Sequence, residues 1–471
     1  MKLKKYRLDI LFVIFLISII LFFLNFFQMG FDSYWHISAG KFMVKNHTIL
    51  TKDVFSWFLY GKKWFSHEWL YEIIIYYFNL IFGKTGNLIY VFVNILILFL
   101  VMYFSNRENI KKNINFSFIW FILSFILISF LTPRPHLISF IFIYLTTYLL
   151  NDLYYNEKSN KIFILPFIQL LWSNIHGGSS NLIYLLIIMY LFIGMFNFDF
   201  KKIQNQRLSF KQVKKYLICM ILCILSICIN PHGFSMITYP YINMGNSFMI
   251  STISEWQPTN FNDFGSYIFL IVFSFVLFIL LFSKKKIRLL DLLIFGFSVF
   301  LGLKNIRFWA FVYLFSFNSI FYYVDSYKVK NIFYIKFSVI ITCFLIIFVF
   351  NHNKIYKNLN NKVISDSAIS YLKDHNPKRL YNYYGYGGYL ISENIKVFVD
   401  GRCDLYSDYN YRDYYNISIL NFGFDKLIKK YDFDYFIIPS DFGLSTYLSN
   451  NNSYQLVYKD KNTVIFKLLN N

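Results

Sequence analysis

Seven long apolar runs constrain the fold of this chain more than any other feature. Each has roughly the 20 residues that a helix needs to cross a hydrocarbon core about 30 Å thick. The runs cover residues 8–27, 86–105, 116–132, 136–151, 216–230, 266–283 and 331–350. Only 15% of the 471 residues are charged, whereas a soluble domain carries about 25%. The sequence therefore predicts a polytopic α-helical membrane protein.

The distribution of basic residues predicts the topology. The net charge of +21 lies mainly in short loops between apolar runs, where it holds loops in the cytoplasm and does not indicate nucleic-acid binding. The amino terminus is predicted to be cytoplasmic, so residues 28–85 form the first external loop. Within that loop, residues 68–83 are too short and too acidic at their start for a span and predict a juxtamembrane helix. The alternation gives about 11 spans.

All eight histidines fall on segments that this topology places outside, although only Lys and Arg were used to assign it. They are His36, His47, His67, His136, His176, His232, His352 and His375. Histidine is the usual acid, base and metal ligand near neutral pH. The sequence therefore predicts that the chemistry lies on the extracytoplasmic face of a plasma-membrane protein.

The first external loop carries one group of candidate residues. Asp32 and His36 directly follow the first span, and His67, Glu68 and Trp69 lie later in the same loop. An acid at the mouth of a helix can face a cavity between helices. The alternative is an interfacial role, in which tryptophans form an aromatic belt and Asp32 is solvated.

Later external segments carry a second group. Arg134 follows a proline at a helix end, and Asn174 and His176 lie on a largely apolar span, where they cost energy unless paired. Arg134 could instead extend to lipid headgroups.

Lys304 and Arg307 lie on the outer side and break the charge rule that the other short loops obey, and Glu255 lies in the external loop 231–265. Phosphate binding would explain the exception, because arginine contacts phosphate in a bidentate manner. Contact with anionic headgroups is the alternative.

Residues 1–350 are expected to form the transmembrane domain, and residues 351–471 a small extracytoplasmic α/β domain. Residues 364–375 have helical spacing with Ser365 or Asp366 as a cap. Residues 395–400 resemble a strand that ends at a charged turn, Asp400-Gly401-Arg402. Such a turn is either a ligand site or a local salt bridge. A helix at 422–431, a strand at 435–439 and a final strand pair complete the domain.

Two familiar catalytic motifs are excluded by the sequence. His67-Glu68 is not the start of a zinc-protease motif, because Tyr71 stands where the second histidine would be. The chain also lacks a phosphate-binding loop that ends in Gly-Lys-Ser/Thr, so it does not contain a cytosolic ATP motor.

Several motifs in this order resemble a bacterial membrane family of the C-type (GT-C, polytopic, lipid-donor) glycosyltransferase superfold. They are Asp32-Ser-Tyr-Trp-His36, His67-Glu68-Trp69-Leu70, Arg134-Pro135, Asn230-Pro-His-Gly233, Glu255-Trp256, Asn305-Ile-Arg307, Gly387-Gly-Tyr-Leu390 and Asp400-Gly-Arg402. The resemblance implies sugar transfer from a polyprenyl-phosphate carrier on the outer face, with Asp32 as the acid at the catalytic centre. Ser254-Glu255 and Arg307 are also similar to motifs of oligosaccharyltransferase catalytic subunits. The tail sequence from Tyr383 to Gly387 departs from that enzyme's acidic, tryptophan-containing motif.

The resulting hypothesis assigns a role to each group. Arg307, Lys304 and Arg134 would hold the donor phosphate, and Asp32 would act as general base on the acceptor hydroxyl, giving inversion at the anomeric carbon. His67, Glu68 and Glu255 would orient the acceptor and the base. His36, His176, Asn174 and Trp69 would line the substrate site.

A divalent cation, magnesium or manganese, is a possible cofactor, with Asp32, Glu68 and Glu255 as its oxygen ligands. The expected partners are a polyprenyl-phosphate-sugar donor, an envelope glycan, lipid or protein acceptor, and membrane lipid.

Two other functions remain open at this point. An O-antigen-type glycan ligase or polymerase would need a large external groove. A non-enzymatic transporter of lipid-linked sugars would have a cavity reaching the inner face and would not depend on Asp32.

Overall fold

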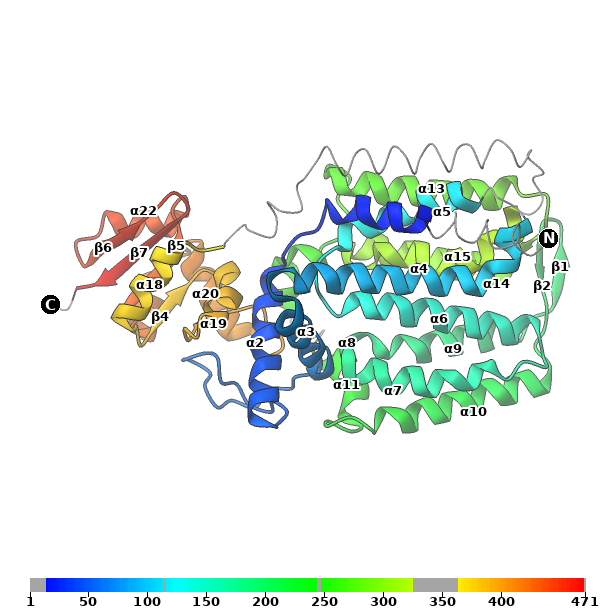
Figure 1. Ribbon diagram of the computed structural model, residues 1–471, viewed down its shortest axis with the longest axis horizontal. Coiled ribbons are helices and arrows are strands. Elements are labelled where there is room, and N and C mark those ends of the chain that lie inside the picture. Colours follow the sequence, from blue (N-terminus) through cyan, green and yellow to red (C-terminus); the bar gives the residue numbers. More distant parts are fainter. Residues whose placement is uncertain (1–13, 113–115, 244–246, 325–362, 470–471) are drawn as a thin grey trace. The chain divides into compact units, whose positions relative to one another are not determined.

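The computed structural model describes residues 14–112, 116–243, 247–324 and 363–469 (Figure 1). The chain forms two compact units. The helical unit comprises residues 1–28, 88–240 and 253–358, and the mixed unit comprises residues 29–87, 241–252 and 359–471. The predicted run at 331–350 and the predicted boundary at 350 lie outside the described residues. The mixed unit groups the first external loop with the C-terminal segment.

The helical unit is built from apolar helices that run side by side. Its first described helix covers Ile14–Leu24. The others are α4 (Gly86–Lys112), α5 (Phe116–Ser124), α6 (His136–Tyr155), α7 (Leu165–Ile175), α8 (Gly177–Ser180), α9 (Leu182–Ile193), α10 (Phe210–Ile227), α11 (Ser235–Asn243), α13 (Phe264–Phe282), α14 (Leu289–Lys304) and α15 (Trp309–Val324). Short 3₁₀ turns join them at η2 (Phe125–Phe130), η3 (Lys161–Ile164), η4 (Ser254–Trp256) and η5 (Ile306–Phe308).

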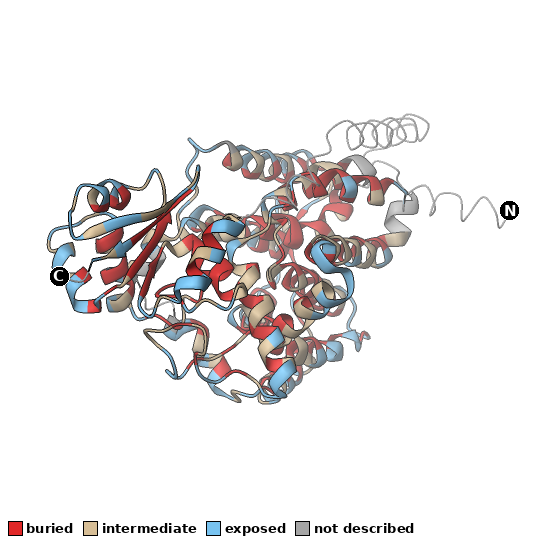
Figure 2. Ribbon diagram, turned by 60° about the vertical axis from the view of Figure 1, so that its left-hand side comes forward, coloured by how far each residue is buried: buried red, intermediate tan, exposed pale blue. Residues whose placement is uncertain are grey.

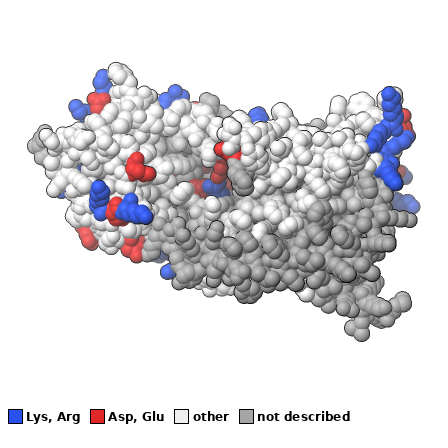
Figure 3. All heavy atoms as spheres, turned by 90° about the horizontal axis from the view of Figure 1, so that it is seen from above, with Lys and Arg blue, Asp and Glu red and all other residues white. Residues whose placement is uncertain are grey.

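Three helical stretches of the described residues are long and apolar enough to cross a membrane. They are Trp69–Arg107, His136–Tyr155 and Gly265–Phe282, and shorter apolar helices accompany them. On the face shown in Figure 3, most of the described atoms belong to residues other than Lys, Arg, Asp and Glu. The chain is therefore an integral membrane protein. The count of 11 spans and the side that each loop faces stay predictions.

Hydrogen bonds define two opposite ends of the helical unit. At one end, Ser139 at the start of α6 bonds His176 at the end of α7. At the other end, Tyr154 at the end of α6 bonds Asn205 in a small sheet of β1 (Phe198–Phe200), β2 (Ile203–Asn205) and β3 (Ile287–Arg288). Segments predicted to be external thus gather at one end, and segments predicted to be cytoplasmic gather at the other.

The mixed unit contains a four-stranded sheet of order β4-β5-β7-β6. Its strands are β4 (Leu380–Asn382), β5 (Tyr435–Pro439), β6 (Tyr454–Lys459) and β7 (Thr463–Leu468). Strand β4 is parallel to β5, and the other pairs are antiparallel. The strands β5 and β7 are buried along most of their length (Figure 2).

Helices surround this sheet and extend the mixed unit. They are α2 (Phe31–Asn46), α3 (Trp69–Phe82), α12 (Ser247–Thr252), α18 (Asp366–His375), α19 (Gly387–Ser392), α20 (Asp408–Ser418), α21 (Phe424–Tyr431) and α22 (Gly443–Ser449), with 3₁₀ turns at η1 (Gly83–Thr85) and η6 (Tyr384–Tyr386). Glycines allow α2 to approach its neighbours closely, because a Cβ on Gly40 would overlap the backbone of Glu72 and one on Gly388 would overlap that of Phe31.

The C-terminal elements agree with the sequence in most places. Ser365 caps α18 by accepting a hydrogen bond from the Ala368 amide, and the strand at 435–439 and the final strand pair form as expected. The strand expected at 395–400 is wrong. The segment forms only an isolated parallel bridge between Val397 and Ser56. The side chain of Asn382 accepts from the Phe398 amide at 2.8 Å and donates to the Val399 carbonyl at 2.8 Å.

Candidate functional site

A chain of alternating acids and histidines lies in the mixed unit. Glu68 contacts two histidines, with Oε2 3.5 Å from His36 Nε2 and Oε1 3.5 Å from His67 Nε2. The other ring nitrogen of His36 lies 3.4 Å from Glu72, whose second oxygen accepts from Ser66 at 2.7 Å. The group therefore joins α2 to the start of α3, and three predicted residues, His36, His67 and Glu68, come together.

Local geometry explains part of this arrangement. Asp32 and His36 are four residues apart on α2, so they share one face of the helix. Glu68 precedes the first residue of α3, and Glu72 lies one turn further along the same helix. Trp69 begins α3 and packs half-buried against the core of the mixed unit.

The C-terminal segment adds a further acid to this chain. Asp404 Oδ2 lies 3.6 Å from His67 Nδ1 and accepts a hydrogen bond from Trp64 Nε1 at 3.0 Å. Burial alone would lower the pKa of His67, but the carboxylates of Glu68 and Asp404 outweigh it and raise the pKa to about 10. His67 is therefore an imidazolium near neutral pH, and it carries positive charge between two acids.

Asp32 lies against the backbone of the Asp400-Gly401-Arg402 turn. Its Oδ1 accepts from Trp35 Nε1 at 3.3 Å. A Cβ on Gly401 would overlap this oxygen and would stand 3.1 Å from Trp35 Nε1. Glycine is therefore required at position 401 for the carboxylate of Asp32 to occupy its place.

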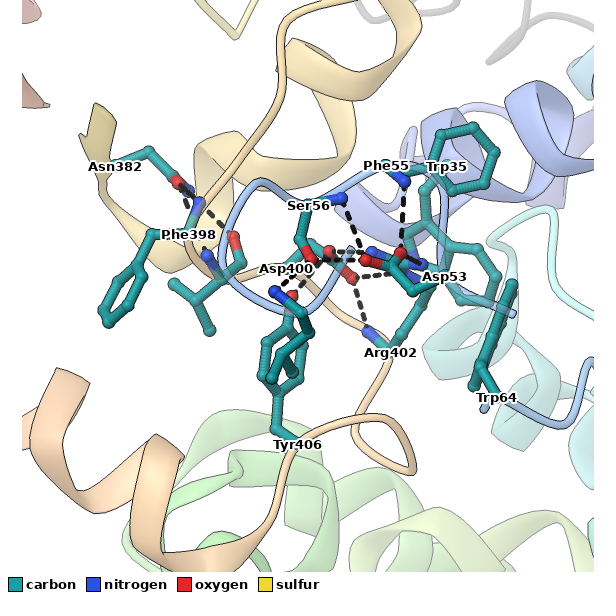
Figure 4. Close-up of polar contacts among 12 residues, drawn as sticks. Trp35, Asp53, Phe55, Ser56, Trp64, Asn382, Phe398, Asp400, Arg402 and Tyr406 are labelled. Carbon is teal, nitrogen blue, oxygen red and sulfur yellow. Dashed lines mark hydrogen bonds and ion pairs between the residues drawn. The ribbon is translucent and has the colours of Figure 1, made fainter. Parts of the chain in front are cut away.

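Beside this turn lies a fully buried ion-pair cluster (Figure 4). The guanidinium of Arg402 donates to Asp53 at 2.5 Å and to Asp400 at 2.6 Å, and all three side chains have 0% exposure. Burial opposes the charge of Arg402, but Asp400 and Asp53 raise its pKa well above the ordinary value. Tyr406 donates to Asp400 at 2.8 Å, and Ser56 donates to Asp53.

This cluster answers the question that the sequence left open for the Asp400-Gly401-Arg402 turn. Arg402 forms a salt bridge within the turn and a second one with Asp53, which lies 349 residues away in the chain. The contacts of Asp404 with His67 and of Arg402 with Asp53 were not predicted. The signals in the sequence were the Asp400-Gly401-Arg402 motif and the density of charge in residues 400–404.

A separate cluster lies at the polar end of the helical unit. Arg134 donates to Glu255, and the guanidinium of Arg307 lies 5.0 Å from the ring of Trp256. Burial opposes ionisation of Glu255, but Arg134 and Arg307 hold its pKa below the ordinary value. Arg134, Glu255 and Arg307 are therefore brought together, while Lys304 is exposed at the end of α14.

Asn174 and His176 both make contacts that join helices. Asn174 donates to the carbonyl of Ile229 at 2.9 Å and accepts from Asn230 at 3.2 Å. His176 Nδ1 lies 2.7 Å from the Ser139 hydroxyl. The polar groups that would be costly on an apolar span are thus paired, and their assignment as substrate-site residues stays a prediction.

The expected metal ligands belong to both units, with Asp32 and Glu68 in the mixed unit and Glu255 in the helical unit. Among the described residues, no three His, Cys, Asp or Glu side chains are arranged to hold a metal ion. Both carboxylate oxygens of Glu68 face histidines, and Asp32 faces Trp35 and the Gly401 backbone. The divalent cation and its three ligands stay a prediction.

Known proteins resemble this chain in fold and not in sequence. The chain matches no protein-family model, and no curated protein sequence matches it. The solved structures that it resembles include those of an archaeal oligosaccharyltransferase, so the chain has an oligosaccharyltransferase-like fold.

One of these solved proteins is the oligosaccharyltransferase AglB from Archaeoglobus fulgidus, to which this chain is similar in fold. Its structure tethered to an acceptor peptide has a TM-score of 0.56 at 13% identity, over 93% of this chain and 69% of that one. Its apo form gives 0.57 at 12% identity, over 93% and 70%. Its complex with an inhibitory peptide and a dolichol-phosphate gives 0.55 at 12% identity, over 93% and 69%.

Proposed function

We propose that this protein is a membrane glycosyltransferase that moves a sugar from a polyprenyl-phosphate-linked donor to an envelope glycan, lipid or protein acceptor on the extracytoplasmic face. Two findings support the class of reaction. The fold is similar to that of an oligosaccharyltransferase whose solved complexes include an acceptor peptide and a dolichol-phosphate. The single observation that carries the proposal is the position of Asp32, on the first turn of α2, next to the histidine–acid chain.

Asp32 is the general base in this proposal. Its carboxylate removes the proton from the acceptor hydroxyl as that oxygen attacks the anomeric carbon. The bond between the anomeric carbon and the phosphate oxygen breaks in the same step, and the polyprenyl phosphate leaves with the electron pair. A single displacement inverts the configuration at the anomeric carbon.

The Arg134–Glu255–Arg307 cluster is assigned to the donor phosphate. Arginine donates two parallel hydrogen bonds to phosphate oxygens, and fixed positive charge stabilises a leaving group that gains negative charge. Glu255 orients the guanidinium of Arg134 through their ion pair and attracts that of Arg307. Lys304 is the exposed cation that first attracts the anionic donor.

The acid–histidine chain shapes the surroundings of the base. His36 shares a helix face with Asp32, and Glu68 lies between His36 and His67. These contacts hold each ring and carboxylate in one orientation. Side chains of fixed orientation can position the acceptor hydroxyl for attack. No step of the proposal depends on a cation.

The test is transfer by the full-length protein in detergent or liposomes, with a defined polyprenyl-phosphate sugar. Asp32→Asn keeps the shape of the side chain and removes the base, so transfer should fall by about 100-fold or more. Asp199→Asn is the matched control, because Asp199 is an exposed acid paired with Lys286 in the helical unit. A folded Asp32→Asn protein that transfers at the normal rate would contradict the assignment of Asp32 as the base, and a wild type that does not transfer would favour a transporter.

A further inference from the structure

Asp404 is the one acid of the histidine–acid chain that comes from the C-terminal segment. Its side chain is 12% exposed, and its Oδ2 lies 3.6 Å from His67 Nδ1. The same oxygen accepts from Trp64 Nε1 at 3.0 Å. Asp404 therefore contacts the first external loop at two side chains.

The backbone around Asp404 is also fixed to that loop. Lys62 Nζ donates to the carbonyl of Leu405 at 2.9 Å. Two residues before Asp404, Arg402 is held by the buried carboxylates of Asp53 and Asp400. The segment that carries Asp404 is thus fastened on both of its sides, so the direction of its carboxylate is set by the fold.

The direction of the Asp404 carboxylate affects the orientation of the His67 ring. One ring nitrogen faces Asp404, and the other faces Glu68 Oε1 at 3.5 Å. An imidazole between two acids has one favourable ring orientation, because a rotation takes both nitrogens away from their partners. Glu68 in turn faces His36 with its other oxygen at 3.5 Å. The orientation of His67 therefore influences that of Glu68 and, through Glu68, that of His36, which lies one turn from Asp32 on α2.

We propose that Asp404 is a positioning residue for sugar transfer: it orients His67, and through His67 it holds Glu68 against His36 beside the base. This inference rests on the proposed function. It also gives the C-terminal segment a role in the reaction, because without that segment the chain of contacts would end at His67.

Asp404→Asn isolates the charge of this residue. The amide is nearly the same size and can still accept the hydrogen bond from Trp64, but it loses the carboxylate that faces His67. Asp404→Glu restores the charge on a longer side chain. The control is Asp432→Asn, because Asp432 is an exposed acid of the same unit and is paired with Arg379.

The measurement is steady-state transfer, with kcat and the KM for donor obtained separately. Asp404→Asn should lower kcat by about ten- to a hundredfold and leave the KM for donor within about twofold. Asp404→Glu should recover a large part of the loss, and Asp432→Asn should behave as wild type. The Asp404→Asn/His67→Gln double variant should be no slower than His67→Gln alone, because Asp404 acts only through His67 and both changes disrupt the same interaction.

Two results would overturn the inference. One is an Asp404→Asn protein with the kcat of the wild type. The other is a double variant whose loss is the product of the two single losses, because independent sites combine in that way.

A wild type without transfer activity would overturn the proposed function. In that case, the thermal unfolding of wild type, Asp404→Asn, His67→Gln and the double variant tests whether Asp404 and His67 interact. Non-additive shifts in unfolding temperature support coupling between Asp404 and His67, and additive shifts contradict it.

Discussion

Replacement of Arg402 tests whether the buried ion-pair cluster stabilises the mixed unit. Arg402→Met has a similar length and removes the guanidinium. It leaves Asp53 and Asp400 buried, and both have 0% side-chain exposure. Hydrogen bonds from Ser56, Tyr406 and backbone amides remain, but the positive charge that neutralises the two carboxylates is lost.

The magnitude follows from the cost of an unpaired buried charge. Removal of one partner from a buried ion pair costs about 3–5 kcal/mol, and a whole domain is stable by only about 5–15 kcal/mol. The mixed unit has roughly 180 residues. For a domain of that size, 1 kcal/mol shifts the unfolding midpoint by about 2–4 °C. Arg402→Met should therefore unfold roughly 6–20 °C below the wild type.

The assay is thermal unfolding of the purified full-length protein in detergent at a fixed scan rate. Arg379→Met is the matched control, because the Arg379–Asp432 pair is exposed at 50% and 66% and an exposed pair is worth about 0–1 kcal/mol. Arg402→Lys should fall between the two, since lysine keeps the charge and loses the planar fork. An Arg402→Met midpoint as close to wild type as that of the control would refute the reasoning.

Three further predictions concern the site. Gly401→Ala should lower kcat by about tenfold or more, because the new Cβ overlaps Asp32 Oδ1. A Gly401→Ala protein with the kcat of the wild type would show that transfer does not depend on the position of the Asp32 carboxylate. Arg307→Gln should raise the KM for the lipid-phosphate donor by about tenfold and leave the KM for acceptor unchanged; equal changes in both would count against a phosphate contact. The pKa of His67 is about 10 when folded, above its ordinary value of 6.5, so its stabilising contribution is complete below pH 6.5 and is lost as pH rises through about 10. His67→Gln should therefore be destabilised most at pH 6, and its unfolding midpoint should approach that of wild type near pH 10; a gap that is constant with pH would contradict this.

The sequence was sufficient where structure depends on local patterns. Long apolar helices follow from the length of the runs, and the cap at Ser365 follows from its place before a helical pattern. The pairing of Asp32 with His36 on one helix face also follows from spacing alone. These features need only neighbours within about one helical turn.

The sequence was insufficient where structure depends on distant contacts. Residues 395–400 have the apolar content of a strand, but they form only one bridge, between Val397 and Ser56, and the side chain of Asn382 bonds the backbone of Phe398 and Val399. The union of the first external loop with the tail depends on Arg402 and Asp53, which are 349 residues apart. No periodicity relates positions at that separation, so the tail appeared as a separate domain.

The candidate site divides in the same way. Resemblance to a known superfold and the sorting of histidines identified His36, His67 and Glu68, and the structure brings them into one chain of contacts. Asp404 contacts His67, and Gly401 lies against Asp32. Both contacts form only because the C-terminal segment packs against the first external loop. Their contribution could be found only from coordinates.

The most direct test of the central claim is the fate of a defined donor. The purified wild-type protein is incubated with a polyprenyl-phosphate sugar labelled in the sugar and with envelope extract as acceptor. We predict release of polyprenyl phosphate in equal amount to labelled product, with inverted configuration at the anomeric carbon. A donor that crosses the membrane of a liposome unchanged, with no release of polyprenyl phosphate, would contradict the account.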